Sequence, residues 1–171
     1  MAFSTSRAAY ATASDDDDLR EFTCWDGDTS QPWVQEVEFY VRFQALKRAR
    51  RTVLFRGRGK ALVAVSAFDA RRVKYPVLGH QWWDGWQLQV VAIRLRDQGT
   101  CLADGTRISD YVLSKTYQLM REEDPERRYV TARVHEKNKR SITAADRLDL
   151  APAMPDPEHP GYWIMLGPTD T

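Results

Sequence analysis

The chain has 171 residues, of which 43% are hydrophobic and 29% are charged, so one globular domain can bury a sizeable core. Its formal net charge of +1 gives no global reason to expect a nucleic acid or an anionic membrane as partner. Two cysteines, Cys24 and Cys101, are too few for a disulfide framework. No apolar run approaches membrane-spanning length and no secretory segment precedes residue 20, so we expect a reduced, cytoplasmic protein.

The N-terminal segment differs in composition from the rest of the chain. It is rich in Ala, Ser and Thr and ends in four consecutive aspartates. Such a segment has little apolar surface to bury, which predicts a disordered tail over residues 1–18. We expect residues 19–171 to form a single domain, beginning with a strand at residues 21–25.

A helix and a hairpin are predicted next. Ser30-Gln31-Pro32 is a helix-start signal, and the following residues fit both helical spacing and strand alternation. The length of the stretch favours a helix. Two β-type runs at residues 52–55 and 61–68 flank a turn at Gly57-Arg58-Gly59, which is typical of a hairpin.

A long aromatic connection over residues 71–86 leads to a third central strand at residues 86–95. The connection holds Trp82, Trp83 and Trp86, three tryptophans within five positions. These side chains either pack a loop or a dimer contact, or line an acceptor site, or offer a stacking surface for a carbohydrate.

The second half of the chain alternates helices and strands. Helices are predicted at residues 102–120 and 141–148, and strands at residues 129–134 and 162–166, after a proline-rich loop. This order predicts an α/β (α+β) fold with a mixed, mostly antiparallel central sheet and helices on both faces.

The most informative stretch runs from Val90 to Met120. An apolar strand enters a polar loop, Gln98-Gly99-Thr100-Cys101-Leu102-Ala103, and a helix-compatible segment follows. The first N–H groups of a helix lack intrahelical partners and favour a phosphate. A second segment begins with the strand at 129–134, and after a short loop Asn138 and Ser141 open a helix.

These two segments resemble the cofactor-binding motifs of the GNAT N-acetyltransferases. The family pattern is Gln or Arg, two residues, Gly or Ala, one residue, Gly or Ala, and Gln98, Cys101 and Ala103 stand at its three positions. Cys101 departs from the pattern, because a small residue is wanted where backbone approaches a phosphate. A second register starts at Arg96 and puts Gly99 in the middle, but the first keeps the spacing from the strand.

The resemblance implies the GNAT fold, in which two neighbouring parallel strands, here 87–95 and 129–134, splay around acetyl-CoA. Backbone groups of the first strand would polarise the thioester carbonyl, and the loop amides would hold the pyrophosphate. The Asn138 amide would hydrogen-bond the pantetheine arm. The implied contacts of acetyl-CoA, used as a co-substrate without a metal, are Val91, Ala92, Ile93, Gln98, Gly99, Thr100, Cys101, Leu102, Ala103, Asn138 and Ser141.

The acid and the base of the reaction are less defined. Many GNAT proteins place a Tyr seven residues beyond the Asn, where this chain has Ala145. Water or Tyr111 are the alternatives for the acid. His80, Asp84 and Glu136 are base candidates, because each flanks a strand that borders the gap and a base can act through one water.

We therefore predict an acetyl-CoA-dependent N-acetyltransferase that acts on an amine of a small molecule or a protein, as a possible homodimer and with no clear nucleic-acid surface. Toxin-like members of the family, which acetylate aminoacyl-tRNA, are a sub-option because Phe22-Thr23-Cys24 and a helix begin the domain in a similar way. The alternative is a non-catalytic acyl-CoA-binding or interaction protein on a GNAT scaffold, supported by Cys101 and Ala145. A third interpretation is an unrelated α/β domain.

Overall fold

The computed structural model describes residues 7–44 and 51–169. They group into two compact units that interleave along the chain. Unit 1 comprises Met1–Phe68 and Val90–Thr116, and unit 2 comprises Asp69–Gln89 and Tyr117–Thr171. Within the described residues, no helix is long and apolar enough to cross a membrane.

Unit 1 holds the N-terminal strands and helices. Its own elements are β1 (Arg7–Tyr10), the 3-10 turn η1 (Ala13–Asp15), α1 (Asp16–Arg20), α2 (Pro32–Gln44), β2 (Arg51–Arg56), η2 (Arg58–Lys60) and η4 (Leu95–Asp97). Three longer elements are shared with unit 2, namely β3 (Leu62–Val73), β4 (Trp83–Ile93) and α3 (Ile108–Glu123).

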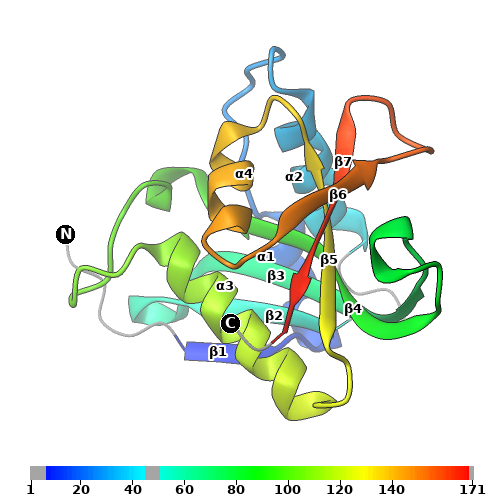
Figure 1. Cartoon of the computed structure of the whole chain (residues 1–171). Helices are drawn as coiled ribbons and strands as arrows, with labels where there is room; N and C mark the ends of the chain where they lie inside the picture. The colour runs from blue at the N-terminus through cyan, green and yellow to red at the C-terminus, as the bar shows by residue number, and fades with distance from the viewer. Residues whose placement is uncertain (1–6, 45–50, 170–171) are drawn as a thin grey trace. The chain divides into compact units, whose positions relative to one another are not determined.

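Unit 2 holds the C-terminal strands. Its own elements are η3 (Pro76–Leu78), β5 (Tyr129–His135), α4 (Lys139–Asp146), β6 (Ala151–Pro155) and β7 (Tyr162–Pro168). Strands β5, β7 and β6 lie side by side in that order (Figure 1). Pro152 and Pro155 fall within β6, which a sequence pattern alone does not favour, but β6 is an edge strand and an edge tolerates missing N–H donors.

Seven strands of the described residues are hydrogen-bonded in the order β1-β2-β3-β4-β5-β7-β6. The β1–β2, β2–β3, β5–β7 and β6–β7 pairs are antiparallel. The β4–β5 pair is parallel and runs from Gly85 opposite Tyr129 to Leu88 opposite Ala132. Both strands continue beyond the last of these pairs. This confirms the predicted mixed, mostly antiparallel sheet with one parallel pair.

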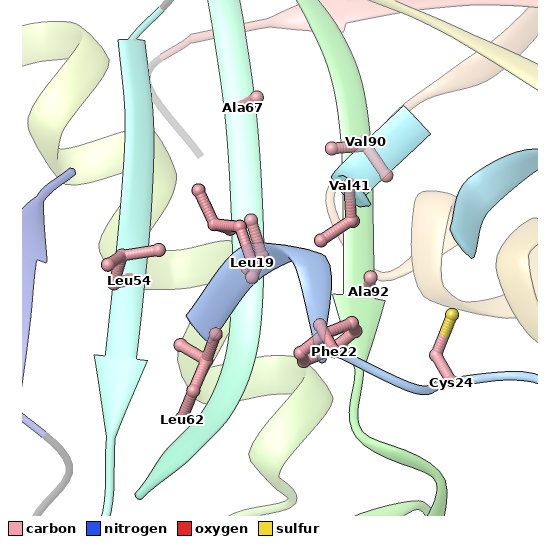
Figure 2. Packing of buried hydrophobic residues seen from close by; sticks show 10 residues of the cluster. Leu19, Phe22, Cys24, Val41, Leu54, Leu62, Ala67, Val90 and Ala92 are labelled. Atoms are coloured by element: carbon pink, nitrogen blue, oxygen red, sulfur yellow. The ribbon is translucent and has the colours of Figure 1, made fainter. Parts of the chain in front are cut away.

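The core of unit 1 forms where α1 and α2 meet the strands. Leu19 and Phe22 lie among Val41 of α2 and residues of the neighbouring strands (Figure 2). The strand residues of this cluster are Leu54, Leu62, Val65, Ala67, Val90 and Ala92. Full burial of a large aliphatic side chain stabilises a fold by about 1.5–3 kcal/mol, so this cluster fixes the end of β4 against the helices.

The N-terminal segment is ordered where the structure describes it, so the predicted disorder is wrong for residues 7–18. Strand β1 pairs with β2, and Asp15 and Asp18 form ion pairs with Arg56 at 2.7 and 2.6 Å. The aspartates of α1 lie in its first turn, where the helix dipole favours negative charge. Residues 1–6 of the predicted tail lie outside the described residues.

Other element boundaries also differ from the prediction. Residues 21–25 form no strand, and the 61–68 strand continues to Val73 as β3. Helix α3 begins at Ile108 rather than at residue 102, because Cys101 pairs with Arg107 in a small antiparallel bridge. Two predicted helices are confirmed, the one that begins near Pro32 as α2 and the one after Asn138 as α4. The predicted strand at 129–134 is confirmed as β5.

Residues 22–25 follow an extended path because a buried carboxylate holds them. Glu38 of α2 accepts hydrogen bonds from the N–H groups of Cys24 and Trp25 at 2.8 and 3.0 Å. Its other oxygen pairs with Arg42 at 3.0 Å, and Arg42 in turn donates to the Phe22 carbonyl at 2.8 Å. Burial, with Glu38 nearby, raises the pKa of the Cys24 thiol to about 12, which makes this thiol unreactive at neutral pH.

We expect Glu38→Ala to lower the free energy of unfolding by about 2–3 kcal/mol, because two backbone donors and a partly buried guanidinium lose their charged partner. Gln35→Ala is the matched control, since Gln35 is exposed on the same helix. Urea unfolding of both variants measures the effect. A Glu38→Ala loss no larger than that of the control would show that Glu38 does not hold this segment.

Candidate functional site

The loop after β4 is anchored to unit 1 at several points. The N–H groups of Arg94 and Leu95 donate to the carbonyls of Val63 and Thr23 at 2.8 and 2.9 Å. The Gln98 side chain donates to the carbonyls of Cys24 and Ile93 at 2.8 and 3.2 Å. Gln98 therefore holds the loop in place with its side chain.

Some backbone N–H groups of the loop donate hydrogen bonds within the loop, and others point outward. Gly99 takes a left-handed φ of 75°, and the Thr100 N–H donates to the Asp97 carbonyl. The Leu102 N–H donates to the Thr106 carbonyl, and the Ile108 N–H donates to the Thr100 carbonyl, at 2.7 and 3.1 Å. These two bonds flank the Cys101–Arg107 pair, so the N–H groups of both residues point away from the bridge. Helix α3 begins at the next residue.

In unit 2, Asn138 and Ser141 are brought together at the start of α4. The Asn138 Oδ1 accepts a hydrogen bond from the Ser141 N–H at 3.1 Å and so caps the helix. In the described part of the chain, the Asn138 Nδ2 donates to no protein group. Ala145 lies in the same helix and is only 6% exposed, so this position presents a buried methyl group.

The four acid and base candidates have different surroundings. His80 is exposed with a left-handed φ of 59°, and Glu136 is exposed after β5. Asp84 is also exposed, at 3.7 Å from Arg72 and 3.8 Å from Arg127. Tyr111 of α3 packs its ring edge against Phe55, with the centroids 6.0 Å apart. In the part of the chain that the structure describes, no His, Cys, Asp and Glu side chains cluster in threes that could hold a metal.

The three tryptophans divide between packing and exposure. Trp86 is buried beneath the Arg127 guanidinium, and Trp83 packs against Tyr129 with the ring centroids 5.3 Å apart. Trp82 is 58% exposed, and both Arg72 and Lys74 lie over its ring. Two of the rings are therefore structural, and the third remains on the surface.

A cavity of about 280 Å³ lies entirely within unit 2. Gln87 of β4 and Thr131 of β5, which pair directly, line its floor. The next pair along, Leu88 and Ala132, is the last of the parallel β4–β5 ladder. The cavity thus adjoins the point where this ladder ends. Its walls come from the end of β3, from Trp82 and from the loop after β6.

Tyr75 lines this cavity and was not predicted as a site residue. Burial raises the pKa of the Tyr75 hydroxyl, and the nearby Arg71 and Arg133 partly oppose that rise. The hydroxyl is therefore protonated at neutral pH and able to donate a proton. The sequence signal for the cavity is the basic residues Arg71, Arg72 and Lys74, which lie in the segment predicted as a connection.

Comparison with known proteins identifies the fold. No protein-family model and no curated protein sequence matches the chain. Solved structures do match it. A tyrosine-to-phenylalanine mutant of KacT has a TM-score of 0.68 at 9% identity, over 97% of this chain and 96% of that one. A structure of histone acetyltransferase HPA2 and related acetyltransferase from Corynebacterium glutamicum has a TM-score of 0.64 at 16% identity, over 96% and 97%.

A third match is AtaTR bound with acetyl-CoA, with a TM-score of 0.66 at 12% identity, over 96% of this chain and 94% of that one. The chain has the GNAT acetyltransferase fold. The GNAT resemblance of the two sequence segments is thereby confirmed at the level of fold. The KacT structure and one AtaT structure carry a tyrosine-to-phenylalanine substitution.

Asp156 lines the cavity of unit 2, and its carboxylate gives a pH-dependent test. Burial alone would raise the pKa of Asp156, but the Glu158 N–H, the Arg133 guanidinium and His159 outweigh it and lower that pKa. Because the folded-state pKa lies below the unfolded value of about 3.9, Asp156 stabilises the fold above about pH 4. This contribution is lost as the pH falls through the folded-state pKa.

We therefore expect the difference in unfolding free energy between the native protein and Asp156→Asn to be largest at neutral pH and to shrink on acidification. Urea unfolding at a series of pH values measures it. A difference that stays constant down to about pH 2 would show that the Asp156 charge does not stabilise the fold.

Proposed function

We propose that the chain is an acetyl-CoA-dependent N-acetyltransferase that acts on an amine of a small molecule or a protein. The observation that carries the proposal is the parallel β4–β5 ladder that ends at Leu88 and Ala132 within a GNAT fold. Two structures of the similar toxin AtaT are described as bound to acetyl-CoA. The loop and the helix start after β4 add the second part of a cofactor site.

Each unit contains residues that we propose as contacts of acetyl-CoA. In unit 1, the backbone of Val91, Ala92 and Ile93 would pair with the pantetheine arm, and the outward N–H groups of the loop would receive the phosphates. The amides of Thr100 and Leu102 donate within the loop, so we assign the phosphate contacts to Gly99, Cys101, Ala103 and the first turn of α3. In unit 2, the Asn138 Nδ2 is the donor available to the pantetheine arm.

Acetyl-CoA, when bound, supplies the activated acetyl group. The chain must then accept a proton from the amine and donate one to the leaving sulfur. Asp84, Glu136 and His80 remain the base candidates, each exposed and able to act through a water. For the acid we propose Tyr75, because it is protonated at neutral pH and lines the cavity where the β4–β5 ladder ends.

A second candidate function is a non-catalytic acyl-CoA-binding protein on the same scaffold. The observations that favour it are the exposed Cys101 in the phosphate loop and the buried Ala145. Calorimetry with acetyl-CoA followed by a thiol-release assay across a panel of amines separates the two. Binding with thiol release supports the enzyme, and binding without thiol release for any amine supports the second function. Absence of binding rejects both.

We expect Cys101→Pro to weaken acetyl-CoA binding by about tenfold or more while the loop stays folded. Proline removes the outward N–H of residue 101, which makes no hydrogen bond within the bridge. Cys101→Ser is the matched control, since it keeps the amide and changes only the side chain. Calorimetry of both variants, with thermal melting as a check of folding, measures the effect. If a folded Cys101→Pro variant bound acetyl-CoA as tightly as the control, the amide of residue 101 would not be a phosphate contact.

For the acid step we expect Tyr75→Phe to lower kcat by about a hundredfold at unchanged acetyl-CoA affinity, within the range that general acid catalysis contributes. Tyr129→Phe is the control, because the Tyr129 ring packs against Trp83 in the same unit. The rate of thiol release with one accepted amine is the measurement. A Tyr75→Phe variant as fast as the control would exclude Tyr75 as the acid.

A further inference from the structure

The cavity of unit 2 is lined by more positive than negative side chains. Its lining contains four cations, Arg71, Arg72, Lys74 and Arg133, and two carboxylates, Asp156 and Glu158. These cations come from the end of β3 and from β5, which are distant in the sequence. The surplus of positive charge is thus a property of the folded unit.

Two of the cations already have an acidic partner. Arg133 Nε lies 2.5 Å from the Asp156 carboxylate, whose side chain is almost fully buried. Arg72 lies 3.7 Å from Asp84, but both side chains are well exposed, so water weakens this pair. The Arg133–Asp156 pair is therefore the structural ion pair of the cavity, and Arg71 and Lys74 take no part in either pair.

Arg71 and Lys74 lack an acidic partner within the described residues. Arg71 donates to the neutral side-chain oxygen of Gln87, which leaves its charge and further N–H donors available. The Lys74 ammonium lies 5.9 Å from the centroid of the Trp82 ring, where it is attracted by the ring face. Both residues line the cavity, so their positive charge would attract an anion placed there.

The size of the cavity limits the ligand. About 280 Å³ lies just below the range of about 300–1,000 Å³ that holds drug-sized molecules, so it suits a small molecule or the end of a chain. The exposed Trp82 ring adds an apolar surface at the rim. A polyamine would bring positive charge to Arg71 and Lys74, which Coulomb repulsion disfavours.

We propose that this cavity is the acyl-acceptor site and that it selects small amines that carry a carboxylate or a phosphate, held by Arg71 and Lys74. The inference rests on the proposed acetyl transfer, since it names the acceptor class for that reaction. The position of the cavity at the end of the β4–β5 ladder supports it, because Gln87 and Thr131 of the floor precede the last pair.

The test compares four amines by the kcat/KM of thiol release. Phosphoethanolamine and β-alanine carry a phosphate and a carboxylate, ethanolamine is the matched amine without an anionic group, and spermidine is the polycation. We expect at least one of the two anionic amines to exceed ethanolamine about tenfold, and spermidine to be the poorest. Which anionic amine is preferred distinguishes phosphate from carboxylate. An equal or better kcat/KM for ethanolamine or spermidine than for both anionic amines would overturn the proposal.

Variants locate the effect in the cavity. Arg71→Gln and Lys74→Gln change exposed side chains, and each is expected to raise KM for the preferred anionic amine about tenfold with little change in kcat. Arg128→Gln is the matched control, because Arg128 is exposed in the same unit and does not line the cavity. If one variant fails to fold, the other carries the test. Unchanged KM in a folded variant would overturn the assignment of that cation.

A binding measurement separates this inference from the proposed function. Calorimetry with phosphoethanolamine and with β-alanine on the protein without acetyl-CoA needs no acyl transfer. Binding that Arg71→Gln or Lys74→Gln weakens and Arg128→Gln leaves unchanged supports the anion site, even where no amine is acetylated. Acetyl-CoA binding and thiol release with no binding of either anionic amine, and with no preference for them, would retain the proposed function and reject the anion site.

Discussion

The parallel pairing of β4 with β5 is the constraint on which the proposed cofactor site depends. The ladder covers Gly85 to Leu88 of β4 and then ends, although the strand continues to Ile93. Backbone N–H and C=O groups in a folded protein must be satisfied by strands, side chains, water or a ligand. A strand that continues past the end of a ladder therefore offers a row of donors and acceptors in a fixed extended form. We propose that acetyl-CoA pairs with this strand end, and the loop after β4 continues directly from it.

The surroundings of β4 explain how a strand end of this kind stays in place. Two polar side chains, Glu38 and Gln98, hold the segment that follows α1. Glu38 accepts the N–H groups of Cys24 and Trp25, while Gln98 donates to the Cys24 carbonyl and to Ile93. The same segment packs Phe22 into the core of unit 1 (Figure 2). Buried polar groups that are fully paired fix one geometry, because any shift would leave a group unpaired.

Part of the fold and of the candidate site could be predicted from the sequence. The loop from Gln98 to Ala103 and the Asn138 segment predicted the fold, because both are local patterns at a fixed distance from a strand. The order of residues 7–18 could not be predicted, since it depends on pairing with β2 and on Arg56, which lie far along the chain. The start of α3 at Ile108 depends on the Cys101–Arg107 bridge, and the helix signals in the sequence do not predict this bridge. The cavity of unit 2 was missed for the same reason, because Arg71 and Arg133 meet only after folding.

Hydrogen–deuterium exchange with and without acetyl-CoA tests the central claim most directly, because it reports on backbone amides of the intact protein. We expect acetyl-CoA to slow exchange in peptides that cover residues 90–93 and 99–110, and in peptides that contain Asn138. Peptides from β1 and β2 serve as the internal reference and should not change. Protection confined to other segments, or no protection at a saturating concentration of acetyl-CoA, would contradict the placement of the cofactor on the end of β4 and its loop.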